Sequence, residues 1–98
     1  MTGTVLITGA ARRIGRHMAL DFADKGWAVA VHYNTSADDA DSVVAEIEAG
    51  GGRAVAVQGD LSASGVPEQI VARSSQALGP LTCLVNNASR FEPDGAET

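Results

Sequence analysis

The chain has 98 residues, 45% of them hydrophobic and 19% charged, which is the length and composition of one small globular domain. Its net charge of −5 argues against nucleic acid as a partner, because binding a phosphate backbone requires a basic surface. The longest apolar run, residues 27–31, is far shorter than the roughly 20 residues of a membrane helix, and the first residues lack the pattern of a signal peptide. Cys83 is the single cysteine, which excludes an internal disulfide and a multi-cysteine metal site. These features predict a soluble, cytoplasmic domain with no membrane partner.

Apolar runs and amphipathic stretches alternate from one end of the chain to the other. Short runs rich in β-branched residues predict four buried strands, at residues 4–8, 27–33, 53–58 and 81–85. Between them, apolar side chains recur at helical spacing and predict three helices. The predicted inward faces are Ile14, Met18, Ala19, Phe22 and Ala23 in the first helix, Ala40, Val43, Val44 and Ile47 in the second, and Ile70, Val71, Ser74 and Leu78 in the third.

Local signals mark the ends of these helices. Gly26 is suited to end the first helix, and Ser36 followed by Asp39 resembles a capping box at the start of the second. Pro67 is tolerated in the first turn of the third. The resulting order, β-α-β-α-β-α-β, predicts an α/β fold of the doubly wound Rossmann type, with a parallel sheet and helices on both faces.

This order accounts for only part of such a fold. A doubly wound dinucleotide-binding domain has two βαβαβ halves, whereas this chain supplies one half and one further strand. By itself the fourth strand would leave an apolar parallel edge unpaired. We therefore expect residues 1–88 to be the N-terminal part of a domain that continues beyond Thr98, and residues 89–98 to begin a substrate or active-site loop. The expected partner of this part is the remainder of the same domain.

Residues 8–16, Thr-Gly-Ala-Ala-Arg-Arg-Ile-Gly-Arg, join the first predicted strand to the first helix. Glycine lets the backbone approach a ligand closely, and a helix N-terminus presents unpaired N–H groups and a partial positive charge to a diphosphate. Gly9 and Gly15 at this junction therefore predict a dinucleotide site, although the strict G-x-G-x-x-G pattern is absent. The alternative is a tight strand–helix turn built of small residues.

The end of the second predicted strand indicates which dinucleotide binds. An NAD site places a carboxylate on the ribose 2′-hydroxyl about 20 residues after the glycines, but residues 31–36 contain none. Arg12 and Arg13 in the loop instead favour the 2′-phosphate of NADP, with His32 and Ser36 as further donors. The alternatives are that the arginines are merely solvated and that His32 is packed at the strand end. The predicted cofactor is NADP(H).

Three segments together resemble the short-chain dehydrogenase/reductase family, over essentially the whole chain. Residues 8–15 are similar to the family's TGxxxGxG loop, residues 59–61 (Gly-Asp-Leu) to its adenine-binding turn, and residues 86–88 (Asn-Asn-Ala) to its NNAG element. All three follow predicted strands, where doubly wound folds bind ligands. The cofactor contacts indicated by the loop, the strand end and the resemblance are Gly9, Arg12, Arg13, Ile14, Gly15, His32, Asn34, Ser36, Asp60, Leu61, Asn87, Ala88 and Ser89.

Two departures from the family pattern resemble its pteridine reductase branch. Arg13 stands in place of the middle glycine of the loop, and Ser89 stands in place of the glycine of NNAG. The branch implies that Arg13 and Ser36 hold the 2′-phosphate, and that Ser89 and Phe91 contact a pterin, on which an aromatic ring can stack. Thr35 departs from the branch, which usually has arginine there. The alternative for Phe91 is a loop anchor packed on the domain.

The resemblance also implies roles for two polar residues at strand ends. Asn87 would support the active-site geometry after the fourth strand, with Asn86 facing the other way, and it is the one catalytic residue that the resemblance places in this chain. Asp60 would contact the adenine. The alternative for Asp60 is a helix N-cap or an Asx turn, both of which aspartate favours.

The family's acid–base pair, Tyr-x-x-x-Lys, is absent from the chain. Tyr33 and Lys25 are its single tyrosine and lysine, in the wrong order and at the wrong spacing for a proton donor and the lysine that lowers its pKa. The resemblance implies a homotetrameric NADPH-dependent oxidoreductase that transfers hydride to a pterin-like or carbonyl substrate, with its catalytic half outside this chain. The alternatives are a 3-oxoacyl-type carbonyl reductase and a non-catalytic NADP(H)-binding module.

Overall fold

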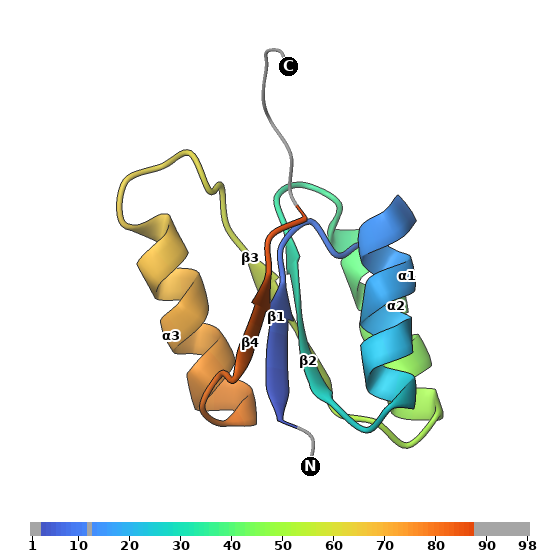
Figure 1. The fold of residues 1–98 in the computed structure, drawn as a ribbon. Helices are drawn as coiled ribbons and strands as arrows, with labels where there is room; N and C mark the ends of the chain where they lie inside the picture. The colour runs from blue at the N-terminus through green and yellow to red at the C-terminus, as the bar shows by residue number, and fades with distance from the viewer. Residues whose placement is uncertain (1–2, 12, 88–98) are drawn as a thin grey trace.

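The computed structural model describes residues 3–11 and 13–87. Four parallel strands form one sheet in the order β3-β2-β1-β4, and helices cover both of its faces (Figure 1). The strands are β1 (Thr4–Ile7), β2 (Ala28–Tyr33), β3 (Ala54–Gln58) and β4 (Cys83–Val85), and the helices are α1 (Arg13–Asp24), α2 (Ala37–Ala49) and α3 (Val66–Leu78). The predicted doubly wound α/β fold is confirmed.

Two hydrophobic cores lie on opposite faces of the sheet, because successive side chains of a strand point to opposite faces. Residues 5 and 7 of β1 pack with the core under α1 and α2, whereas Leu6 packs with Ile70 in the core under α3. The stripe predicted for α2 is confirmed, since Ala40, Val43 and Ile47 are all buried. Burial on both faces explains why the strands are continuous apolar runs.

The order of the strands fixes where a ligand can bind. The chain moves from β1 outward to β2 and β3, and then crosses back so that β4 pairs with the other side of β1. Doubly wound sheets bind ligands at the carboxyl ends of the strands, beside the point where the direction of winding reverses. In this chain the reversal lies between β1 and β4, so the loops after these strands are the place to look for a site (Figure 1).

Some predicted details are wrong. Ile14 is 70% exposed rather than part of the inward face of α1, because it lies in the first helical turn, and the buried residues of α1 are Gly15 and Ala19. Val71 is 41% exposed, whereas the other three residues predicted for the inward face of α3, Ile70, Ser74 and Leu78, are buried as expected.

The Ser36 side-chain bond of the predicted capping box is absent, and the predicted strand ends shift by one or two residues. Ser36 is the N-cap residue of α2, but its side chain makes no hydrogen bond to the helix. Trp27 falls outside β2, since its N–H donates to the carbonyl of Phe22 and its ring packs edge-on against the Phe22 ring, with centroids 5.2 Å apart. Among the described helices, none is long and apolar enough to cross a membrane.

Candidate cofactor site

The loop after β1 is held by hydrogen bonds that run toward β2. Gly9 has a φ of +62°, in the left-handed region that favours glycine. Its N–H donates to Nδ1 of His32 (2.9 Å), and the N–H of Ala10 donates to the His32 carbonyl (2.9 Å). These two amide groups are therefore already bonded within the protein. The N–H groups left for an anion are those of the first turn of α1, which have no helical partners.

The His32 side chain does not have the role predicted from the sequence. It is 2% exposed, and its Nε2 lies 2.8 Å from the carbonyl oxygen of Gly59, after β3. With both ring nitrogens bonded to backbone groups, the ring has no donor left for a 2′-phosphate. The packed alternative is the one that the structure contains, and the predicted phosphate contact of His32 is wrong.

Burial also sets the protonation state of His32. Desolvation in the packed strand end lowers its pKa below 6.5, the Arg73 guanidinium on α3 acts in the same direction, and the hydrogen bond to the Gly59 carbonyl opposes them. Burial disfavours the charged form of histidine because water no longer solvates it. The ring is therefore neutral at physiological pH.

The same loop is tied to the end of β4 on its other side. The Thr8 hydroxyl accepts a hydrogen bond from the N–H of Asn87 (2.9 Å) and lies 3.1 Å from Oδ1 of Asn86. Nδ2 of Asn87 donates to the carbonyl of Gly9 (3.2 Å). Asn87 thus contacts the β1 loop directly, next to the reversal point of the sheet, whereas Asn86 lines a groove on the face covered by α3.

Gly15 permits the close packing of α1 against this loop. A Cβ atom at residue 15 would lie 2.2 Å from the carbonyl oxygen of Gly9, 2.6 Å from Nδ2 of Asn87 and 2.9 Å from Cα of Ala10. Two of these three neighbours are backbone atoms, which cannot move aside alone. The requirement for glycine at this position is therefore helix–strand packing rather than the approach of a ligand.

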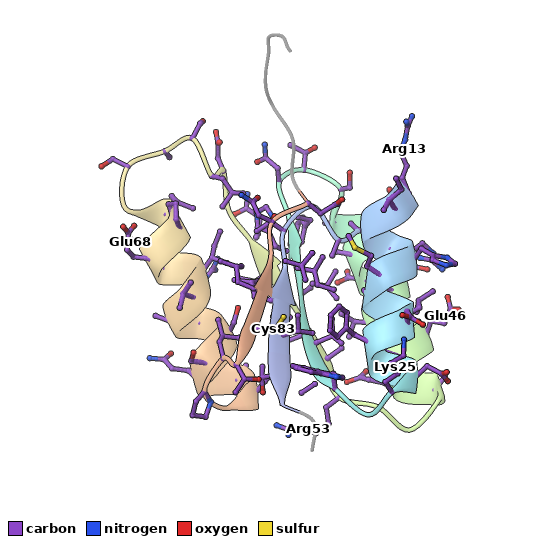
Figure 2. The ribbon with its side chains drawn as sticks, viewed as in Figure 1. Arg13, Lys25, Glu46, Arg53, Glu68 and Cys83 are labelled. Carbon is purple, nitrogen blue, oxygen red and sulfur yellow. The ribbon has the colours of Figure 1, made fainter. Side chains whose placement is uncertain are left out.

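The first turn of α1 is electropositive. It contains no acidic residue, whereas the first turn of α2 contains Asp38 and Asp39. Arg13 is exposed and has a φ of +57°, a conformation that favours glycine and is unusual for arginine. Figure 2 shows its side chain extending from the start of α1 at the carboxyl end of the sheet, away from the helix. The helix dipole and the guanidinium together favour an anion here.

The loop after β3 forms a compact turn. Oδ1 of Asp60 accepts hydrogen bonds from the N–H and the hydroxyl of Ser62 (2.9 and 2.6 Å), which is the Asx-turn alternative. A Cβ atom at Gly59 would lie 2.7 Å from side-chain atoms of Ile70 and Val66, so this loop packs closely on α3. Leu61 is partly buried against the core under α3, and its expected contact with a cofactor remains a prediction.

The structure describes only some of the remaining residues predicted to contact the cofactor or substrate. Asn34 is exposed after β2, where its carbonyl accepts a hydrogen bond from Nε2 of Gln58 (2.9 Å), and Ser36 follows it at the start of α2. Both lie at the carboxyl end of the sheet, on the same side as Arg13. Four predicted site residues lie outside the described residues: Arg12, Ala88, Ser89 and Phe91.

Tyr33 and Lys25 lie at opposite ends of the sheet. Tyr33 ends β2 at the carboxyl end, whereas Lys25 follows α1 and pairs with Asp21 across 2.7 Å. Figure 2 shows Lys25 at the other end of α1 from Arg13. These two residues therefore cannot act on one substrate. Within residues 3–11 and 13–87, no group of three or more histidine, cysteine or acidic side chains is placed to hold a metal ion.

Comparison with known protein families identifies the family of this chain. The sequence pattern of the short-chain dehydrogenases matches residues 3–97. The chain belongs to the short-chain dehydrogenase family. The resemblance seen in its three strand-end segments is thereby confirmed, and members of this family are oxidoreductases.

The relatives of this short-chain dehydrogenase chain are much longer than the chain itself. An L-rhamnose 1-dehydrogenase (NAD(P)(+)) of Sphingomonas sp. is 44% identical over 85 residues, which are 87% of this chain and 34% of that protein. The 3-oxoacyl-[acyl-carrier-protein] reductase FabG of Staphylococcus epidermidis is 39% identical over 88 residues, covering 90% of this chain and 36% of that protein. The chain thus spans about a third of the length of these relatives.

A solved structure has the same fold and a bound dinucleotide. The FolM alternative dihydrofolate reductase 1 of Brucella suis, in complex with NADP, superposes with a TM-score of 0.86 at 42% identity, covering 93% of this chain and 37% of that one. A protein of Burkholderia cenocepacia solved with bound NADP superposes with a TM-score of 0.82 at 33% identity, covering 87% of this chain and 33% of that one. The fold of this chain is thus shared by proteins whose structures hold NADP.

Proposed function

We propose that this chain is the NADP(H)-binding part of an NADPH-dependent short-chain reductase. The observation that carries the choice of NADP(H) over NAD(H) is Arg13, an exposed guanidinium in the first turn of α1 where the family loop has glycine. A 2′-phosphate needs a positive partner, and residues 31–36 offer no carboxylate to repel it. The two NADP-bound relatives support the same choice.

Each part of the carboxyl end would hold a different part of the dinucleotide. The free N–H groups of the first turn of α1, including those of Ile14 and Gly15, would bind the diphosphate, and Arg13 with Ser36 would bind the 2′-phosphate. Asp60 and Leu61 would contact the adenine. Asn87, which holds the β1 loop through the Gly9 carbonyl, would support the geometry on the nicotinamide side.

The reaction itself needs more than this chain. When bound, NADPH supplies the hydride, and this chain's residues bind and orient the dinucleotide. The proton donor belongs to the remainder of the domain, which we propose as the partner of the open β4 edge. Leu84 is 61% exposed on β4, and with Val71 it lines an apolar groove of about 260 Å³. That groove and edge are where a further helix and strand of the same sheet would pack.

The substrate is proposed as a pterin-like compound or a carbonyl compound. The similarity to an alternative dihydrofolate reductase favours a pterin, with Ser89 and Phe91 as its contacts and residues 89–98 as the start of the substrate loop. The similarity to 3-oxoacyl reductases favours a carbonyl reductase as the second candidate. We further propose that the assembled protein is a cytoplasmic homo-oligomer, as the lone cysteine and the family resemblance suggest.

The cofactor proposal is tested by comparing two arginines of α1. We expect NADP⁺ to bind more tightly than NAD⁺, and Arg13→Ala to weaken NADP⁺ binding about tenfold, the effect of one lost charge-assisted hydrogen bond, while leaving NAD⁺ binding unchanged. Arg16→Ala is the matched control, because it removes the same charge from the same helix but Arg16 pairs with Glu46 on α2 across 2.6 Å. Calorimetric titration measures both affinities. Equal affinity of the unmodified chain for NAD⁺ and NADP⁺ would refute the proposal.

A further inference from the structure

The four strand ends are linked by hydrogen bonds in the order in which the strands lie in the sheet. The Gly59 carbonyl after β3 bonds to the His32 ring at the end of β2, the ring bonds to the Gly9 N–H after β1, and the Gly9 carbonyl bonds to the Asn87 side chain after β4. Among the described residues, the His32 ring joins the loop after β3 directly to the loop after β1.

The partners of His32 fix its tautomer. The Gly9 N–H is a donor, so Nδ1 must present a lone pair at 2.9 Å. The Gly59 carbonyl is an acceptor, so Nε2 must carry the proton at 2.8 Å. Only the neutral ring protonated on Nε2 satisfies both bonds, and a histidinium would set two N–H groups against each other at Gly9.

The two glycines linked by this ring are each hydrogen-bonded through both of their backbone groups. Gly9 donates to the ring and accepts from Asn87, while Gly59 donates to the Tyr33 carbonyl (3.0 Å) and accepts from the ring. Each glycine is thus held at both its N–H and its carbonyl, which belong to the two peptide groups on either side of it. The loops after β1 and β3 are fixed relative to each other through a single buried imidazole.

We propose that His32 is a positioning residue for the dinucleotide: its Nε2-protonated ring holds the diphosphate loop and the adenine loop in their binding arrangement before the cofactor arrives. This inference rests on the proposed NADP(H) site. Preorganised loops bind a ligand more tightly because no free energy of binding is lost to ordering them. The two hydrogen bonds of the ring, to Gly9 and to Gly59, form a bridge between the loops. If loss of this bridge leaves the binding arrangement of the loops in about one molecule in ten, the apparent Kd rises about tenfold.

Three substitutions separate the two arms of the bridge. In His32→Asn, the side-chain oxygen can still accept from the Gly9 N–H, but the donor to Gly59 is lost. In His32→Gln, the longer amide can still donate to the Gly59 carbonyl, but the acceptor for Gly9 is lost. His32→Leu removes both. Val43→Ala, at a fully buried site on α2, is the control for a general loss of core packing.

The bridge itself is tested without any cofactor. In the ¹⁵N-labelled chain we expect a scalar coupling across the hydrogen bond between the Gly9 amide nitrogen and Nδ1 of His32. We also expect protection of the Gly9 amide from hydrogen exchange that survives in His32→Asn and is lost in His32→Gln. A ring protonated on Nδ1 would overturn the inference.

Binding then tests the positioning role. NADP⁺ would reach both loops, whereas adenosine, which has no phosphate for Arg13 or the first turn of α1, would reach only the adenine side. We expect His32→Leu to weaken NADP⁺ about tenfold or more, His32→Gln to weaken NADP⁺ but not adenosine, and His32→Asn to weaken both. Variants of His32 that bind NADP⁺ as tightly as Val43→Ala would overturn the role. If the unsubstituted chain binds no NADP⁺, the proposed function fails and the positioning role with it, even where the coupling is present.

Discussion

Replacing Gly15 by alanine tests how the site is packed. The added methyl group would lie 2.2 Å from the Gly9 carbonyl oxygen and 2.9 Å from Cα of Ala10, so either α1 or the β1 loop must move. Overpacking of this kind costs about 1–3 kcal/mol, and alanine regains only about 1 kcal/mol over glycine within a helix. Since the clashing atoms belong to the backbone, the cost lies at or beyond the upper end of that range.

The expected result is a net loss of about 2 kcal/mol in the free energy of unfolding. For a domain of this size, that loss lowers the Tm by about 8–16 °C. Circular dichroism, followed during heating and during urea titration, measures both quantities. NADP⁺ binding should also weaken, because the displaced loop carries the hydrogen bonds of Gly9.

Gly50→Ala is the matched control for this substitution. Gly50 has a φ of −86°, and a Cβ atom there would lie 3.6 Å from its nearest neighbour, an ordinary contact. This variant should be stabilised by about 0.4–1 kcal/mol, because alanine restricts the unfolded chain. If Gly15→Ala proves as stable as Gly50→Ala, the packing explanation of Gly15 is refuted.

Three further predictions follow from single side chains. Thr8→Val should lower the free energy of unfolding, measured in urea, by about 1–3 kcal/mol, because it leaves the N–H of Asn87 without its acceptor. Thr8→Ser should keep most of that stability, and an equal loss of stability in the two variants would contradict the role of the hydroxyl. Arg13→Gly should raise the free energy of unfolding by up to about 1 kcal/mol, because glycine relieves the positive φ, and it should reduce the preference for NADP⁺ over NAD⁺. A variant in which the stability and the NADP⁺ preference both rise, or both fall, would contradict this prediction. Burial lowers the pKa of His32, so the neutral ring stabilises the fold above pH 6.5. The free energy of unfolding should fall as the pH decreases from 6.5 toward the folded-state pKa, by at most about 1.4 kcal/mol per pH unit. Denaturant unfolding of His32→Asn over the same pH range should lack that slope.

The topology could be predicted from the sequence because its signals are redundant. Each strand is a continuous apolar run, each helix has a stripe of buried residues, and a glycine follows each of the three helices, so an error in one signal did not change the fold. Ile14 and Val71 were misplaced because helical periodicity gives the spacing of a face but not which neighbours are present to cover it. Ile14 lies in the first turn of α1, with most of its surface in solvent.

The site was predicted only in outline. Strand-end motifs located the three loops correctly, since the carboxyl ends of parallel strands share one edge. The role of His32 was missed because its partners are backbone groups 23 and 27 residues away, and pairing of that kind depends on strand register. One signal could have indicated it: His32 interrupts an otherwise apolar buried run, and a polar side chain in such a place needs partners within the protein. Thr8, which holds Asn87, was missed for the same reason.

The most direct test of the account is the mapping of NADP⁺ onto the ¹⁵N-labelled chain by amide chemical shifts. Glycines mark both ends of the sheet, with Gly9, Gly15 and Gly59 at the carboxyl end and Gly3, Gly26 and Gly52 at the amino end. A dinucleotide site at the carboxyl end predicts saturable shifts at the first three glycines and none at the last three. Shifts at the amino end, or no shifts at any glycine, would contradict a dinucleotide site at the carboxyl end of the sheet.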